Sequence, residues 1–296
     1  MRDFPVSPLG KRGKEKRMSL LIEAEELMVR IGRPDLVILD ATSVLPGQSF
    51  DPDENFRVRR IVGARRFDIE CFSDPDTTLP HMVPSQGRFG RLFGDLGIEA
   101  SSEVVFYDQT GVASACRGWW LADLFGHANV RVLNGGLPAW SRVNGAVESG
   151  PAAAPVSKTY HASPRYSRLK GLGDVLSLSG TPDAVILDAR SKARFAGTAK
   201  EPRPGVRSGH IPGSRNVPFG ELLDAENRFL PASDIRFRLE QEGVDGGQPV
   251  ITTCGSGLTA CVLAAALVVA GFPRGAVYDG SWAEWGSLPD TPIATL

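Results

Sequence analysis

Residues 249–285 read PVITTCGSGLTACVLAAALVVAGFPRGAVYDGSWAEW, and the fold class is clearest in these residues. It has the pattern of an apolar strand, a glycine-rich turn, an apolar helix, a short strand and an Asp-Gly turn before a tryptophan. Residues 104–140, VVFYDQTGVASACRGWWLADLFGHANVRVLNGGLPAW, repeat the same order, and Trp140 matches Trp285 at an offset of 145. The chain therefore carries one structural unit twice.

A second pair of segments supports the duplication. LVILDATS at 36–43 and AVILDARS at 184–191 are both short β-branched strands that end in an aspartate. Strands that alternate with helical patterns indicate βαβ units around a mostly parallel sheet. We therefore expect an α/β fold with two tandem domains, 19–148 and 166–296, joined by a linker at 149–165 that is rich in Pro, Ala and Ser.

Composition excludes several classes of protein. A length of 296 residues suggests two domains of ordinary size, and 33 basic against 34 acidic residues leave no basic excess for nucleic-acid binding. The longest apolar run, 261–270, is about half of the roughly 20 residues that a membrane-spanning helix needs. We expect neither a membrane nor a nucleic-acid partner.

Residues 1–18 are basic and lack the apolar segment of a signal peptide, so we expect a disordered tail or translation that starts at Met18. The four cysteines form no CxxC pair and favour a reducing, cytoplasmic setting. Three of them, Cys71, Cys116 and Cys261, are expected to be buried, small apolar residues.

Cys254 differs from these three, because it stands between a strand and a glycine-rich turn that leads into a helix. Such a turn can aim several N–H groups at one point, and the helix adds positive potential there. Both effects favour a thiolate and predict a Cys254 pKa below the usual value of about 8.5. The first copy has Asp108 at this position and lacks the thiol. Cysteine phosphatases place an arginine six residues after the nucleophile, where this chain has Ala260.

From about Ser19 onward the chain resembles the rhodanese/3-mercaptopyruvate sulfurtransferase family. The resemblance rests on DARSKARFAG (188–197), EPRPGVRSGHIPGSRNVPF (201–219), CGSGLTAC (254–261) and YDGSWAEWG (278–286). It implies two rhodanese-like domains, of which only the second is catalytic. It also implies that Cys254 carries sulfur as a persulfide.

The residues after the cysteine indicate the sulfur donor. Members that use thiosulfate tend to carry basic side chains there, whereas members that use mercaptopyruvate resemble Cys-Gly-Ser-Gly-Val-Thr. This chain has Gly255, Ser256, Gly257, Leu258 and Thr259. The neutral loop favours 3-mercaptopyruvate as the donor, and these residues are expected to contact it.

The resemblance also places Arg194 and Arg203 against the carboxylate and ketone of the substrate, a role that suits planar guanidinium groups. The alternative is that these arginines form ion pairs with Glu201 or Asp188. Arg190 has two candidate roles, since it either faces the active site or supports the loop.

A proton relay is the next expectation. Ser256, two residues beyond the nucleophile, is placed to bond the substrate carbonyl or to pass on a proton. By resemblance, His81 and a carboxylate support it. That carboxylate falls on Glu70, which departs from the family's aspartate, and Asp68 is an alternative partner. His210 is expected to hold structure through hydrogen bonds.

Two other functions stay open: a thiosulfate sulfurtransferase of the same fold, and a persulfide carrier or redox-sensing protein. The expected acceptor is cyanide or a thiol such as thioredoxin. This chemistry needs no metal and no organic cofactor.

Overall fold

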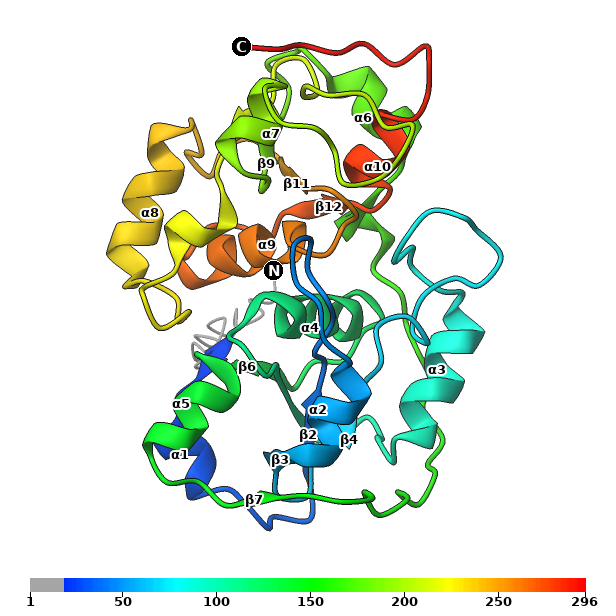
Figure 1. Ribbon diagram of the computed structural model, residues 1–296, viewed down its shortest axis with the longest axis vertical. Helices are drawn as coiled ribbons and strands as arrows, with labels where there is room; N and C mark the ends of the chain where they lie inside the picture. The colour runs from blue at the N-terminus through cyan, green and yellow to red at the C-terminus, as the bar shows by residue number, and fades with distance from the viewer. Residues whose placement is uncertain (1–18) are drawn as a thin grey trace, which may run out of the picture.

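The computed structural model describes residues 19–296, which form two α/β domains of the same topology (Figure 1). The first domain has a five-stranded sheet in the order β1-β6-β5-β2-β4, and the second has β8-β12-β11-β9-β10. All neighbouring strands in both sheets are parallel. The predicted duplicated α/β architecture is confirmed. The predicted tail, residues 1–18, lies outside the described residues.

The elements of the first domain are β1 (Leu21–Ile22), α1 (Ala24–Met28), β2 (Leu36–Asp40), α2 (Pro52–Val58), β3 (Arg60–Ile61), β4 (Arg65–Arg66), α3 (Gln86–Asp95), β5 (Glu103–Tyr107), α4 (Ala113–Leu124), β6 (Val130–Leu133), α5 (Gly136–Arg142) and β7 (Val147–Glu148). Those of the second are the 3-10 helix η1 (Tyr166–Arg168), β8 (Leu169–Lys170), α6 (Leu172–Leu178), β9 (Val185–Asp188), α7 (Lys192–Ala196), β10 (Arg215–Asn216), η2 (Phe219–Leu222), α8 (Ala232–Gln241), β11 (Val250–Thr253), α9 (Ala260–Val269), β12 (Ala276–Tyr278) and α10 (Ser281–Trp285).

The two repeated stretches form the centres of the two domains. β5 and β11 are buried along their whole length and occupy the middle of their sheets. The apolar run after Thr259 forms α9, and the chain leaves this helix through Gly271 in a left-handed conformation. Cys254 therefore stands at the carboxyl end of a central parallel strand, where open α/β sheets place their ligands.

Helices α4 and α9 pack against each other where the domains meet, in the middle of the molecule (Figure 1). Every residue of α4 is buried, and α9 is buried from Ala260 to Leu267. A helix that is apolar on all sides must be covered on all sides. Each domain supplies the cover for the other, and one hydrophobic core runs through both.

The segment predicted as a linker is docked on the first domain. Its Tyr160 packs edge-on against Phe93, with ring centroids 4.9 Å apart, and is 9% exposed. A Cβ atom added to Gly94 would lie 2.3 Å from the carbonyl oxygen of Lys158. Only glycine therefore lets the segment approach α3 this closely.

One expectation about the cysteines is wrong. Cys71 is exposed, because it lies in the turns that follow β4, whereas Cys116 and Cys261 are buried as expected. No disulfide joins cysteines in the described part of the chain. Between residues 19 and 296, no helix has the length and apolar character to cross a membrane.

Candidate active site

A cavity of about 690 Å³ lies where the two domains face each other. The first domain contributes the loop 44–48 and His81, and the second contributes Cys254 with its glycine turn and the segments after β9. The cavity thus contains most of the residues that the sequence singled out: His81, Arg190, Arg194, Arg203, Cys254, Gly255, Ser256, Leu258 and Thr259.

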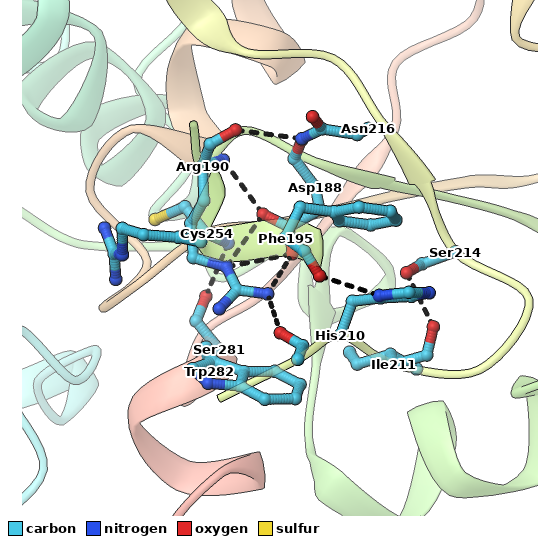
Figure 2. Close-up of polar contacts among 12 residues, drawn as sticks. Asp188, Arg190, Phe195, His210, Ile211, Ser214, Asn216, Cys254, Ser281 and Trp282 are labelled. Carbon is cyan, nitrogen blue, oxygen red and sulfur yellow. Dashed lines mark hydrogen bonds and ion pairs between the residues drawn. The ribbon is translucent and has the colours of Figure 1, made fainter. Parts of the chain in front are cut away.

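Cys254 is 1% exposed and is held by the start of α10. Its N–H donates to Ser281 Oγ at 3.2 Å, and its carbonyl accepts from Trp282 N at 3.0 Å (Figure 2). The N–H groups of 255–259 donate no hydrogen bond to any described residue. These five consecutive N–H groups therefore have no acceptor within the described chain, and a glycine-rich turn is the kind of backbone that can offer such groups to an anion.

The corresponding loop of the first domain already holds an anion. Asp108, 1% exposed, accepts hydrogen bonds from the backbone N–H groups of Thr110 at 2.8 Å, Gly111, and Ser114 at 3.0 Å. Burial raises the pKa of Asp108, and these three donors oppose that rise. The same strand–turn–helix backbone is therefore able to bind a negative charge at the position of Cys254.

Ser256, His81 and Glu70 form a continuous hydrogen-bonded chain. His81 Nδ1 lies 3.1 Å from Ser256 Oγ, and His81 Nε2 lies 2.8 Å from Glu70 Oε1. The hydrogen bond with His81 lowers the pKa of Glu70, which keeps the carboxylate ionised. Because an ionised carboxylate accepts the Nε2 proton, Nδ1 is left to accept from the serine hydroxyl. Asp68 instead accepts from Glu70 N at 3.0 Å.

Arg190 is buried beneath the cysteine and is fully engaged with the protein (Figure 2). Its guanidinium bonds to Asp188, Glu201 and the carbonyl of Gly209, and it stacks over Trp282 at 4.3 Å. These contacts favour loop support among the two roles that the sequence left open.

His210 points away from Cys254 in the same view. Its Nδ1 lies 2.8 Å from the Phe195 carbonyl oxygen, and its ring stacks on Phe195 with centroids 3.8 Å apart. This is the structural type of contact that the sequence leads us to expect of His210.

Arg194 and Arg203 differ in their partners. Arg194 donates from Nε and Nη2 to Glu201, so one edge of its guanidinium is occupied. Its Nη2 lies 3.0 Å from the place where a Cβ of Gly255 would stand, so the group lies directly against the nucleophile loop. Arg203 is half-buried, lines the cavity, and forms no ion pair within 4.0 Å among residues 19–296.

The neutral residues after Cys254 divide into two groups. Gly255, Leu258 and Thr259 line the cavity. Gly257 instead shapes the turn: its φ is +77°, and an added Cβ would lie 2.7 Å from the carbonyl oxygen of Asp279. A side chain at that position would be strained by the positive φ and by the close contact with the Asp279 carbonyl oxygen.

Comparison with known proteins identifies the family. The model of the rhodanese-like domain matches the chain twice, over residues 23–143 and 172–288. The chain belongs to the rhodanese family. Thiosulfate/3-mercaptopyruvate sulfurtransferase 1, mitochondrial, of Arabidopsis thaliana is 38% identical over 93% of this chain and 78% of its own. The human 3-mercaptopyruvate sulfurtransferase is 38% identical over 86% of each chain.

A solved structure of this family agrees with the fold. SseA of Escherichia coli, described as a 3-mercaptopyruvate sulfotransferase, superposes with a TM-score of 0.81 at 34% identity. The match covers 90% of this chain and 99% of SseA. The tandem rhodanese architecture therefore extends through most of the described chain.

For Arg194, the alternative of an ion pair with Glu201 is what the structure shows, and Glu201 also binds Arg190. Sequence reasoning missed two residues of this rhodanese-family site, Arg117 and Asp279, which form a buried ion pair beside the loop. A signal for Arg117 was present, because a charged residue in the middle of an apolar helix requires a buried partner. Asp279 lies in the YDGSW motif, where it reads simply as a turn residue.

The described residues contain no group of three or more His, Cys, Asp or Glu side chains that could hold a metal ion. The two carboxylates that contact Arg190 and Arg194, Asp188 and Glu201, are each taken up in ion pairs.

Proposed function

We propose that this chain transfers sulfur from 3-mercaptopyruvate to an acceptor through a persulfide on Cys254. The observation that carries the proposal is the chain from Glu70 through His81 to Ser256, which ends two residues from Cys254 in the same cavity. A sulfur donor that bears a ketone leaves behind an enolate, and a group that can accept and donate a proton is needed to protonate that enolate. The names of the Arabidopsis and human relatives support the same activity.

The reaction begins when the Cys254 thiolate attacks the sulfur of the donor. A sulfur–sulfur bond forms, and the bond between sulfur and C3 breaks with its electron pair left on the carbon side. The product is the enolate of pyruvate, which takes up the proton released by the donor thiol. Ser256 and His81 carry that proton, with Glu70 stabilising the imidazolium. The outer persulfide sulfur is then attacked by the acceptor.

Binding of the donor falls to the arginines and the loop. Arg203 and the free edge of Arg194 offer planar donors to the carboxylate and the ketone. The free N–H groups of 255–259 suit the negative charge of the persulfide, as those of the first domain suit Asp108.

Thiosulfate is the second candidate donor, because the Arabidopsis relative carries both names and Arg194 and Arg203 also suit a sulfonate. The absence of Lys or Arg at 255–259 favours the monoanion mercaptopyruvate over this dianion. A persulfide carrier with no small-molecule turnover is the third, and a cavity with two arginines counts against it.

The test measures pyruvate release from 3-mercaptopyruvate and thiocyanate formation from thiosulfate, with cyanide as the acceptor and Cys254→Ser as the control. We expect a preference for mercaptopyruvate that the substitution abolishes. A preference for thiosulfate would assign the arginines to a sulfonate. No turnover of either donor, with a persulfide detected by mass, would establish the carrier.

For the physiological acceptor we propose a thiol protein such as thioredoxin, and for the compartment the reducing cytoplasm. Support comes from the free state of all four cysteines, one of them exposed. Turnover with reduced thioredoxin, measured as pyruvate release without cyanide, tests the acceptor. Fractionation of the source cells tests the compartment, and recovery in an organelle would contradict the proposal.

A further inference from the structure

A buried ion pair joins the two domains next to the Cys254 loop. Arg117 in α4 and Asp279 after β12 approach to 2.9 Å between Nη2 and Oδ1, with side chains 0% and 3% exposed. The guanidinium also lies over the ring of Trp120, at 4.8 Å. Burying two charges is costly, and apolar residues of similar size often stabilise a protein as well or better. The contacts of this ion pair indicate a role other than stability.

The pair is bonded to backbone atoms of both loops that form the active site. Arg117 Nη1 donates to the carbonyl of Gly257 at 3.3 Å, and Nη2 donates to the carbonyl of His81. Asp279 Oδ2 accepts from Val83 N at 2.6 Å. One guanidinium and one carboxylate thus connect the loop of the serine in one domain to the loop of the histidine in the other.

Both loops need such support. His81 has a φ of +60°, a left-handed conformation that costs free energy for any residue with a side chain. Gly257 has a φ of +77°. These are the residues whose carbonyls Arg117 binds, and the His81 ring leaves this backbone to reach Ser256 Oγ at 3.1 Å.

We propose that Arg117 and Asp279 are positioning residues that hold the imidazole of His81 against Ser256. The inference deepens the proposed function and rests on it. Arg117 suits the task because its planar fork bonds several acceptors at fixed angles, which an ammonium group does not. On this basis the first domain contributes, besides His81 itself, the group that sets the orientation of His81.

The experiment compares Arg117→Lys and Asp279→Asn with the wild type, measuring kcat and KM for 3-mercaptopyruvate. We expect kcat to fall by about 10- to 100-fold and KM to change by less than about threefold, since a misplaced catalytic group mainly lowers the chemical step. If Arg117→Lys fails to fold, Asp279→Asn provides the same test. A fall confined to KM, or no fall in either variant, would overturn the proposal.

Arg60 provides the matched control. It is 2% exposed, pairs with Glu148 at 2.9 Å and lies over the ring of Phe56 at 4.9 Å, and it does not line the cavity. Arg60→Lys therefore removes a buried guanidinium of similar surroundings, and kcat should stay within about twofold of the wild type. An equal fall of kcat in Arg60→Lys and Arg117→Lys would mean that general destabilisation is responsible.

A double-mutant comparison tests whether Arg117 acts through His81. In a His81→Ala background, Arg117→Lys should lower kcat by less than about threefold, because the group that it positions is gone. The same 10- to 100-fold fall in both backgrounds would overturn the proposal.

An NMR measurement separates this inference from the proposed function. The chain has four histidines, so His81→Ala assigns the His81 ring signals. These signals should move in Arg117→Lys and stay in place in Arg60→Lys, whether or not mercaptopyruvate is the donor. Unchanged His81 signals in Arg117→Lys would refute the positioning role, whereas a wild type without turnover would refute only the proposed function.

Discussion

Replacing Glu70 by glutamine should slow the enzyme only slightly. The Glu70 side chain is 63% exposed, although its Oε1 lies 2.8 Å from His81 Nε2. Coulomb's law at the dielectric constant of water gives about 1.5 kcal/mol for unit charges at that distance. Measured exposed ion pairs contribute about 0.2–1 kcal/mol. The imidazolium in the transition state therefore loses at most about 1 kcal/mol, which is no more than about fivefold in kcat.

Removing the imidazole itself is a different change. His81→Ala deletes the group that exchanges a proton with Ser256, and general acid–base catalysis is typically worth about 10²–10⁴-fold. Steady-state release of pyruvate at saturating 3-mercaptopyruvate measures both variants. The two effects should therefore differ by at least an order of magnitude.

The pH dependence gives a further check on Glu70. Its pKa is lowered by the hydrogen bond with His81, so its charge is present at every pH above the ordinary glutamate value and is lost only as pH falls through the lowered pKa. The ratio of wild-type to Glu70→Gln kcat should be constant from about pH 8 to pH 9, above the range in which histidine ordinarily titrates.

Glu54→Gln is the control, because Glu54 forms an exposed ion pair with Arg57 outside the cavity and should leave kcat unchanged. A fall of more than about 50-fold in Glu70→Gln would refute the reasoning from exposure. It would mean that the carboxylate is shielded from water when the donor is bound.

Three further predictions concern stability and reactivity. Gly94→Ala should destabilise the protein by about 1–3 kcal/mol, because the added Cβ would clash with the docked segment 149–165. Gly87→Ala on the same helix adds a Cβ that contacts nothing, and it should stabilise the protein by about 0.5–1 kcal/mol. Urea unfolding measures the free energy of unfolding of both variants. Trp282→Ala should cost about 3–5 kcal/mol in the same assay, since the ring is 1% exposed, and Phe237→Ala, at 62% exposed, should cost little. A hydrogen bond to a neighbouring carboxylate raises the pKa of Cys71 to about 11, so its alkylation, followed by mass spectrometry, should keep accelerating up to about pH 11; a plateau near pH 9 would contradict this.

The fold could be predicted because its central strands, turns and helices each have a recognisable pattern within a short stretch of sequence. Strand, turn and helix signals recur in 104–140 and 249–285, and both stretches form the expected elements. The docked linker at 149–165 could not be predicted, because its composition is that of a tether. Its position depends on Tyr160 meeting aromatic residues far away in the sequence.

The site was predictable as far as local motifs and the family resemblance reach. The turn after Cys254 and the cavity position of Arg203 could be read from one segment each. The pairing of Arg194 with Glu201 was one of the alternatives that the sequence left open, whereas the pairing of Arg117 with Asp279 could not be predicted. Nothing local to Arg117 identifies a partner 162 positions away, so only the packing of the two domains reveals it.

The shared core of α4 and α9 has a consequence for how the chain is made. α9 ends 145 residues after α4 does. At a synthesis rate of about 5–20 residues per second, α9 is completed about 7–30 s after α4, and until then α4 lacks the helix that buries it. During that interval the nascent first half exposes a surface prone to aggregation, which holding chaperones would have to protect.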